Sequence, residues 1–291
     1  MTTLADVLDV ATASHTGMVR PHNEDSVYAN SDSGVFILAD GMGGYNAGEV
    51  ASDMATSLLG STLDDLFAVQ PAYSDVSGGK YGEVVLVREI SATNRSIYNA
   101  AQSNPQYAGM GTTLVASVFH DDAVTVAHIG DSRLYRFRND ALEQLTKDHS
   151  LLQEQIDGGI ITKAQARHSQ NKNLVTRALG VDLSVDTEMH TYPVLPGDLY
   201  LLCSDGLNDM IEDEEIAMAL EALGANLSLC ATHLVQMAND NGGRDNVSVI
   251  LVRVKCVFPA PISALGAAGG AGNGEHGFWQ RIWQRLRYWF R

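Results

Sequence analysis

Two kinds of hydrophobic pattern alternate along most of the chain. Apolar runs rich in Val, Ile, Leu, Phe and Tyr predict β-strands. They cover residues 35–39, 113–119, 123–129, 134–138, 199–203 and 247–254. Apolar residues at three- and four-residue spacing predict helices over residues 47–67, 83–101, 212–223 and 227–238. Because several strands follow one another directly, the pattern predicts an α+β fold with substantial antiparallel sheet.

Three further segments interrupt this pattern. Residues 70–82 are rich in Gly, Ser and Pro and are expected to form a surface connection between helices, while residues 146–180 are expected to form a polar excursion near one sheet edge. The globular domain is expected to end near residue 257, where a Pro/Gly/Ala-rich linker covering residues 258–277 begins.

The last segment, residues 278–291, reads FWQRIWQRLRYWFR. Its aromatic and aliphatic residues can share one helical face while its arginines occupy the other, so we expect a basic, Trp-rich amphipathic helix. Such a helix could lie in a membrane interface. It could equally bind a partner protein or a second copy of the chain, or pack on its own acidic domain.

Composition narrows the functional classes. The 291 residues carry a formal net charge of -16, and a field of that sign repels nucleic acid and phosphorylated ligands unless local cations oppose it. Three scattered cysteines suit a reducing compartment better than a disulfide framework. The first residues lack the basic and apolar regions of a secretory signal, and no apolar run reaches about 18 residues. We therefore expect a cytoplasmic protein that does not bind nucleic acid, associated with a membrane only through the C-terminal helix, if at all.

Aspartates recur where the predicted strands end. Asp40, Asp131 and Asp205 close the runs FILADG, VAHIGD and YLLCSDG, and Asp245 precedes the last strand in the turn GGRDN. A single Asp-Gly pair usually marks only a turn. Four carboxylates at strand ends favour a site for hard divalent cations, which prefer oxygen ligands. A glycine at position 41 would let its backbone carbonyl approach such an ion.

A second polar cluster lies near the N-terminus, in the run RPHNED. One interpretation is a solvated, charged turn. The alternative is that Glu24 and Asp25 complete a metal site while the guanidinium of Arg20 donates hydrogen bonds to phosphate oxygens.

Eight motifs in order resemble those of the PP2C-type (PPM) metal-dependent protein phosphatases, particularly the bacterial branch. They are RPHNED, FILADGMGGYNAGEVAS, GMGTTLVAS, VAHIGDSRLYRF, LTKDHSL, TRALG, LLCSDGLNDM and GGRDNVSVILVRV. The resemblance implies a phosphatase domain over residues 9–257. It also implies a PP2C-like central β-sandwich of two mainly antiparallel sheets flanked by helices.

The same resemblance implies the roles of individual residues. The implied metal ligands are Glu24, Asp25, Asp40, Gly41, Asp131, Asp205 and Asp245. Asp40 would bridge two ions, Asp205 and Asp245 would complete one shell, and Asp131 would help hold a weaker third ion. Arg20 would bind the substrate phosphate, and together with Asp40, Asp205 and Asp245 it forms the expected catalytic set.

The implied activity is hydrolysis of phosphoserine and phosphothreonine in proteins. Two Mn²⁺ or Mg²⁺ ions would activate a water and offset the acidity of the chain at the site. The expected partners are phosphorylated proteins, including a bacterial Ser/Thr kinase that the phosphatase opposes or the targets of that kinase.

One position departs from eukaryotic members of the family. Met42 stands where those members have a histidine proposed as the general acid, so another group must protonate the leaving oxygen. His149 and His168 are conceivable helpers, although an ordinary structural or solvated histidine is the commoner case. Cys203 lies inside an apolar run and is expected to be a core residue.

Two other functions remain open at this point. A catalytically silent relative could bind phosphoproteins as a regulator, but every expected carboxylate is present here. A different two-metal phosphohydrolase could act on nucleotides or nucleic acid, but the catalytic region shows no basic groove with interleaved aromatics.

Overall fold

The computed structural model describes residues 3–44, 47–166 and 174–258. Its contacts divide the chain into a unit at Met1–Pro259 and a second at Ala260–Arg291. His168, the predicted C-terminal helix and all but the first residue of the predicted linker lie outside the described residues. No helix in the described part is long and apolar enough to cross a membrane.

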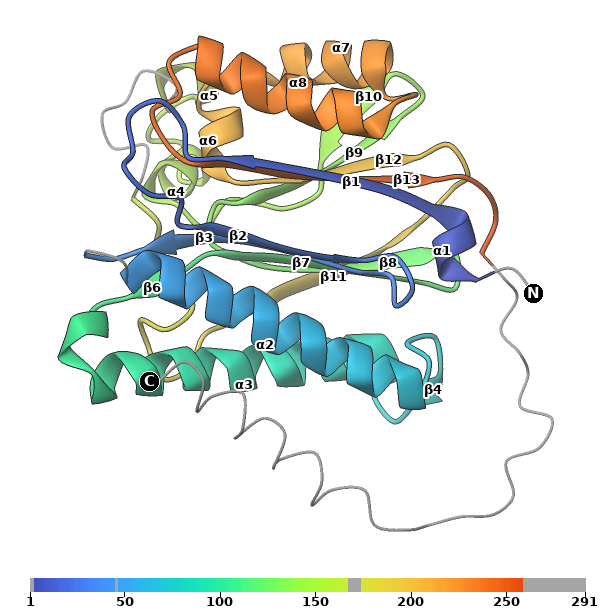
Figure 1. The fold of residues 1–291 in the computed structure, drawn as a ribbon, viewed down its shortest axis with the longest axis horizontal. Coiled ribbons are helices and arrows are strands. Elements are labelled where there is room, and N and C mark those ends of the chain that lie inside the picture. Colours follow the sequence, from blue (N-terminus) through green and yellow to red (C-terminus); the bar gives the residue numbers. More distant parts are fainter. Residues whose placement is uncertain (1–2, 45–46, 167–173, 259–291) are drawn as a thin grey trace. The chain divides into compact units, whose positions relative to one another are not determined.

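Two antiparallel β-sheets lie face to face in the first unit (Figure 1). The first sheet has five strands in the order β1-β13-β12-β9-β10, and the second has the order β11-β8-β7-β3-β2, with a short β6 paired to β3. The strands of the first sheet are β1 (Leu8–His15), β9 (Arg133–Arg138), β10 (Ala141–Gln144), β12 (Leu199–Cys203) and β13 (Val247–Val254). Those of the second are β2 (Asp25–Asn30), β3 (Val35–Met42), β6 (Gly111–Thr112), β7 (Leu114–His120), β8 (Ala123–Ile129) and β11 (Glu188–Pro193).

Helices cover the outer faces of both sheets, so the unit has α-β-β-α layers (Figure 1). The long helices α2 (Ala47–Val69) and α3 (Tyr81–Ser103) cover the second sheet, whereas α7 (Asp213–Leu223) and α8 (Leu227–Asp240) cover the first. The shorter helices are α1 (Leu4–Val7), α4 (Leu151–Asp157), α5 (Lys163–Ala166), α6 (Asp205–Asn208) and the 3₁₀ turn η1 (Pro105–Tyr107).

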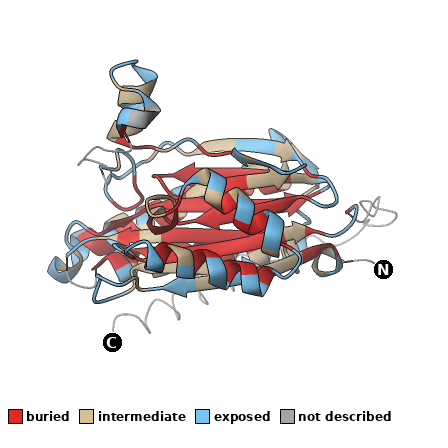
Figure 2. Ribbon diagram, turned by 90° about the horizontal axis from the view of Figure 1, so that it is seen from above, coloured by how far each residue is buried: buried red, intermediate tan, exposed pale blue. Residues whose placement is uncertain are grey.

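Burial follows these layers (Figure 2). Every residue of β7 and of β12 is buried, because each of these strands is covered on both faces. Between the sheets, the ring of Phe119 meets those of Phe36 and Tyr200 edge-on, at centroid distances of 5.6 and 5.2 Å. Edge-on packing of this kind adds stabilisation beyond the buried area and fixes how the two sheets face each other.

The structure confirms the predicted α+β class with its two antiparallel sheets and flanking helices. All six predicted strands and all four predicted helices are present, with ends shifted by no more than a few residues. In the two sheets of the sandwich, the strands β1, β2, β6, β10 and β11 were not predicted. The segment 70–82 is more ordered than expected, because it contains the small hairpin of β4 (Asp75–Val76) and β5 (Gly79–Lys80).

Candidate active site

Strand register brings the predicted carboxylates to one edge of the sandwich. In the second sheet, Asp25 at the start of β2 lies directly opposite Asp40 in β3. In the first sheet, the last residue of β12, Cys203, pairs with Arg133 on one side and Val249 on the other. Asp205, two residues after the end of β12, therefore lies close to both neighbouring strand ends. One is the turn before β9, which contains Asp131, and the other is the start of β13, which Asp245 precedes by two residues.

Hydrogen bonds join the two sheets at this edge. The side chain of Ser204, in the first sheet's β12–α6 turn, donates to the carboxylate of Asp25 at 2.8 Å. The backbone carbonyl of Asp40 accepts from the amide of Thr113 at 2.9 Å, and the hydroxyls of Thr113 and Ser132 lie 2.7 Å apart. The turn holding Asp131 is thus tied to the strand end holding Asp40.

Asp131 is buried, the other carboxylates of the cluster are partly buried, and all of them repel one another. Burial raises the pKa of Asp40 well above its usual range, and the nearby charges of Asp25, Asp205, Asp131 and Asp245 raise it further. Burial likewise raises the pKa of Asp205 well above its usual range, with Asp131 as the largest charged contributor. Burial raises the pKa of Asp25 to about 6 and that of Asp131 to about 7. A cation at this edge would relieve both the desolvation and the repulsion.

The cluster also contains oxygens without protein partners. Among the described residues, Oδ1 of Asp25 and Oδ1 of Asp205 are buried and accept no hydrogen bond. Buried polar atoms are almost always paired with protein, water or a metal ion. An all-oxygen donor set of carboxylates suits Mg²⁺ or Mn²⁺ rather than a metal that prefers sulfur. These residues therefore fit a divalent cation.

Gly41 is required by close packing. A Cβ at this position would lie 2.1 Å from the carbonyl oxygen of Gly48 and 2.7 Å from that of Glu24. A Cβ on Gly48 would in turn lie 2.6 Å from a carboxylate oxygen of Glu24. The glycines let the start of α2 approach the end of β3 and hold Glu24 beside Gly41, whose amide donates to the Glu24 carbonyl at 3.0 Å.

Arg20 and Asp245 form an ion pair, with Nη2 of the arginine 2.6 Å from Oδ2 of the aspartate. This pairing was not anticipated from the sequence, which indicated separate roles for the two residues. The Arg20 side chain remains 47% exposed. A guanidinium carries five N–H donors, so most of the donors of Arg20 remain available to a ligand.

Asp209 is a member of the cluster that the sequence analysis missed. Its charge raises the pKa of both Asp131 and Asp205, and it lines a hollow of about 170 Å³ together with them. The amide of Asp209 donates to the carbonyl of Asp205 at 2.8 Å. The i, i+4 spacing of these two aspartates in SDGLND could have indicated that they share one helical face.

Of the two candidate histidines, only His149 lies within the described residues. The ring of His149 is buried and contacts the backbone of Gly130, next to Asp131. Met42 lines a separate groove with residues 175–178 and the segment that follows. Cys203 is fully buried, which raises the pKa of its thiol to about 12, in keeping with a core role.

Comparison with known proteins gives consistent similarities. The profile of the protein phosphatase 2C family matches residues 14–242. The serine/threonine phosphatase stp of Listeria welshimeri is 40% identical over 239 residues, which cover 81% of this chain and 92% of that protein. The serine/threonine protein phosphatase PstP of Mycobacterium tuberculosis is 39% identical over 248 residues, which cover 85% of this chain and 45% of that protein.

Solved structures agree with this. The crystal structure of Mycobacterium tuberculosis PstP superposes with a TM-score of 0.77 at 37% identity, covering 86% of this chain and 99% of that one. A second structure, of the PstP catalytic domain in complex with two manganese ions, has a TM-score of 0.74 over the same shares. Stp1 of Staphylococcus aureus has a TM-score of 0.76 at 33% identity, covering 88% of this chain and 98% of that one.

These similarities confirm the resemblance seen in the eight motifs, and they favour an enzyme over a silent regulator because the curated relatives are themselves named as phosphatases. Since the family profile covers well over half of the chain and relatives are 39–40% identical to it over 81–85% of its length, the chain belongs to the protein phosphatase 2C family and is a serine/threonine phosphatase.

Proposed function

We propose that this phosphatase hydrolyses phosphoserine and phosphothreonine in proteins with two divalent cations, Mn²⁺ or Mg²⁺, held at the edge of the sandwich. The observation that carries the proposal is the partly buried, mutually repelling group of carboxylates around Asp40. The proposed metal ligands are Glu24, Asp25, Asp40, Gly41, Asp131, Asp205 and Asp245.

The electrostatics support a central place for Asp40. Four other aspartates raise the pKa of Asp40, and four also raise that of Asp205. A bridging ligand suits a position where several negative charges meet, and the family resemblance assigns that role to Asp40. Asp205 and Asp245 would complete the shell of one ion, with the carbonyl of Gly41 and the carboxylates of Glu24 and Asp25 supporting the pair. Asp131 and Asp205, which share the hollow with Asp209, would hold the weaker third ion.

Bound divalent cations would supply a water that is acidic enough to attack at neutral pH and would neutralise charge on the phosphoryl group. The protein's own part is to hold the carboxylates rigidly on strand ends and to orient the substrate. Arg20, anchored through Nη2 by Asp245, can direct its other N–H groups at phosphate oxygens. Met42 has no proton to donate, so the leaving oxygen must be protonated by a different group.

The proposed substrates are phosphorylated proteins, among them a bacterial Ser/Thr kinase or its targets. A net charge of -16 favours basic surroundings of the phosphosite over acidic ones, because the long-range field repels anionic partners. Nucleic acid is disfavoured as a substrate for the same reason.

The segment 278–291, with four arginines among its aromatic residues, is proposed to bind an anionic membrane surface or a partner protein. Removing residues 264–291 should then release the protein from liposomes that contain anionic lipid. Unchanged partitioning of the truncated protein would contradict membrane binding.

Calorimetric titration with Mn²⁺ tests the ligand assignment. We expect two tight sites in the wild type, loss of both in Asp40→Asn, and loss of one in Asp245→Asn. Asp65→Asn is a matched control, because Asp65 lies exposed on α2 away from the other acids discussed here, and it should titrate like the wild type. Two intact sites in Asp40→Asn would contradict the bridging role.

A further inference from the structure

His149 holds both backbone polar groups of Gly130. Its amide donates to the Gly130 carbonyl at 2.9 Å, and its ring Nδ1 accepts from the Gly130 amide at 3.2 Å. Gly130 has a φ of 103°, and a Cβ there would lie 2.7 Å from the Thr113 side chain, so this turn is open only to glycine. The next residue in the chain is Asp131. The orientation of Asp131 therefore depends on a turn that His149 closes.

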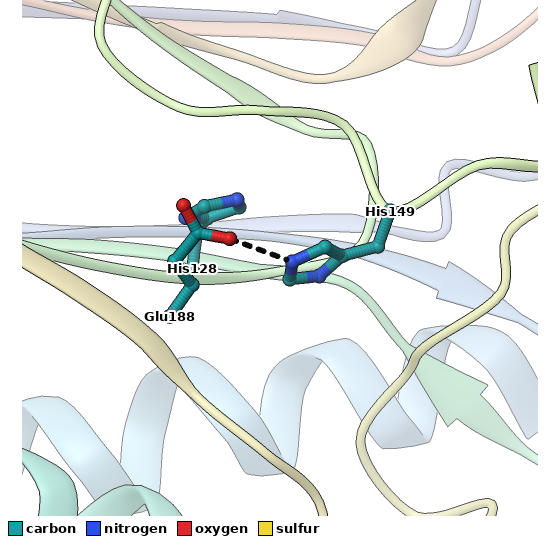
Figure 3. A group of neighbouring side chains, drawn as sticks. All are labelled: His128, His149 and Glu188. Atoms are coloured by element: carbon teal, nitrogen blue, oxygen red, sulfur yellow. Dashed lines mark hydrogen bonds and ion pairs between the residues drawn. The ribbon is translucent and has the colours of Figure 1, made fainter. Parts of the chain in front are cut away.

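His149 is itself fixed from three other sides. Its carbonyl accepts from the amide of Thr176 at 2.8 Å. Its ring stacks on that of His128, with centroids 4.7 Å apart and planes 16° apart. Its Nε2 lies 3.3 Å from a carboxylate oxygen of Glu188, which points at the ring from β11 (Figure 3). His149 thus connects the Asp131 turn to Thr176 through its backbone and to Glu188 through its ring.

The contacts with Gly130 and Glu188 favour one tautomer of the ring. Because Nδ1 accepts a hydrogen bond, its lone pair is occupied and the ring proton lies on Nε2, where it is donated to Glu188. Burial lowers the pKa of His149, which keeps the ring neutral. Nη1 of Arg177 lies 3.3 Å from the same Nε2 and brings a positive charge.

This arrangement disfavours a metal ion at His149. Donor atoms of His128, His149 and Glu188 lie within 4.8 Å of one another, a spacing that could suggest a metal site. However, in the tautomer that accepts from the Gly130 amide, Nε2 of His149 carries the ring proton and has no lone pair to offer a cation, and the guanidinium of Arg177 lies 3.3 Å from it. The group is better described as a support for the neighbouring turn.

We propose that His149, oriented by Glu188, is a positioning residue that fixes the Gly130 turn so that the Asp131 carboxylate faces Asp205. The catalytic consequence rests on the proposed function, in which Asp131 is a metal ligand. The contacts between His149 and Gly130 do not depend on a bound metal ion.

Two substitutions test the contacts of the two ring nitrogens separately. The side-chain oxygen of asparagine can occupy the place of Nδ1, so His149→Asn keeps an acceptor for the Gly130 amide and loses the donor to Glu188. The amide of glutamine reaches the place of Nε2, so His149→Gln keeps the donor and loses the acceptor. If the ring only filled space, the larger glutamine would be the milder change.

Hydrogen exchange of the Gly130 amide in metal-free protein tests the support directly. We expect His149→Gln to speed exchange at Gly130 at least about tenfold, the scale of one lost buried hydrogen bond, and His149→Asn to change it by less than about threefold. Equal exchange in the two variants, or faster exchange in His149→Asn, would overturn the proposal.

Mn²⁺ titration then tests the consequence for Asp131. We expect His149→Gln to lower the affinity for the same Mn²⁺ ion as Asp131→Asn does. The double variant should bind that ion no more weakly than Asp131→Asn alone, because both changes act through one carboxylate. An additional loss in the double variant would show that His149 acts elsewhere and would overturn the positioning of Asp131. If Asp131→Asn leaves Mn²⁺ binding unchanged, Asp131 is not a metal ligand. Hydrogen exchange at Gly130 then tests whether His149 fixes the turn.

Discussion

Replacing Asp131 by Asn should stabilise the metal-free protein. Burial raises the pKa of Asp131 from an ordinary 3.8 to about 7. Below pH 3.8 the carboxyl is protonated in both the folded and the unfolded chain, so it imposes no penalty. As the pH rises toward 7, only the unfolded chain ionises, and the folded state progressively loses free energy relative to it.

The size of the penalty follows from the two pKa values. At about 1.36 kcal/mol for each pH unit between them, the loss reaches about 4 kcal/mol above pH 7 and is about 2 kcal/mol at pH 5. Asparagine has nearly the same shape and no charge. Asp131→Asn should therefore raise the free energy of unfolding by up to about 4 kcal/mol at pH 8, and by about half as much at pH 5.

Urea denaturation in EDTA at the two pH values measures this difference. Circular dichroism is the suitable probe, because it follows the strands and helices of the sandwich themselves, whereas all three tryptophans, Trp279, Trp283 and Trp289, belong to the C-terminal segment. Asp65→Asn should change the stability by less than about 0.5 kcal/mol. A metal-free Asp131→Asn protein that is no more stable than the wild type at pH 8 would refute the reasoning.

Three other predictions concern packing and reactivity. Gly41→Ala should abolish activity and lower the free energy of unfolding by at least about 2 kcal/mol, because the new methyl group would clash with the carbonyl of Gly48. Denaturation and turnover assays that find a stable, active variant would contradict this. A thiol reagent at pH 8 should modify only the exposed Cys256 in the native protein and all three cysteines in denaturant, whereas fast modification of three native thiols would contradict the buried positions of the other two. Asp198→Ala should cost about 3–5 kcal/mol in urea denaturation, since Asp198 is 1% exposed and accepts two 2.6 Å hydrogen bonds from Arg138; a loss below about 1 kcal/mol would show that the pair is not needed.

The sequence predicted the core strands well because their burial is visible in composition. β7 and β12 are covered on both faces and therefore appear as continuous apolar runs. No residue of β2, DSVYAN, or of β11, EMHTYP, is fully buried, so neither strand shows a clear apolar run. These strands depend on pairing with β3 and β8, which local patterns do not show.

For the candidate site, too, the sequence identified individual residues but not the contacts between them. Carboxylates at strand ends could be identified one by one, because Asp next to Gly after an apolar run is a local signal. That Asp25 lies opposite Asp40, and that Arg20 pairs with Asp245, follows from register and from the meeting of the two sheets. The role of His149 depends on contacts with residues 19 to 39 positions away, which spacing alone does not predict.

The most direct test of the account is phosphate release from a phosphothreonine peptide by the full-length chain, with Mn²⁺, with EDTA and with Asp205→Asn. The account predicts turnover that requires added Mn²⁺ and falls at least about a hundredfold in Asp205→Asn, while circular dichroism shows an intact fold. Turnover that persists in EDTA, or an Asp205→Asn variant as active as the wild type, would contradict the proposed metal-dependent mechanism.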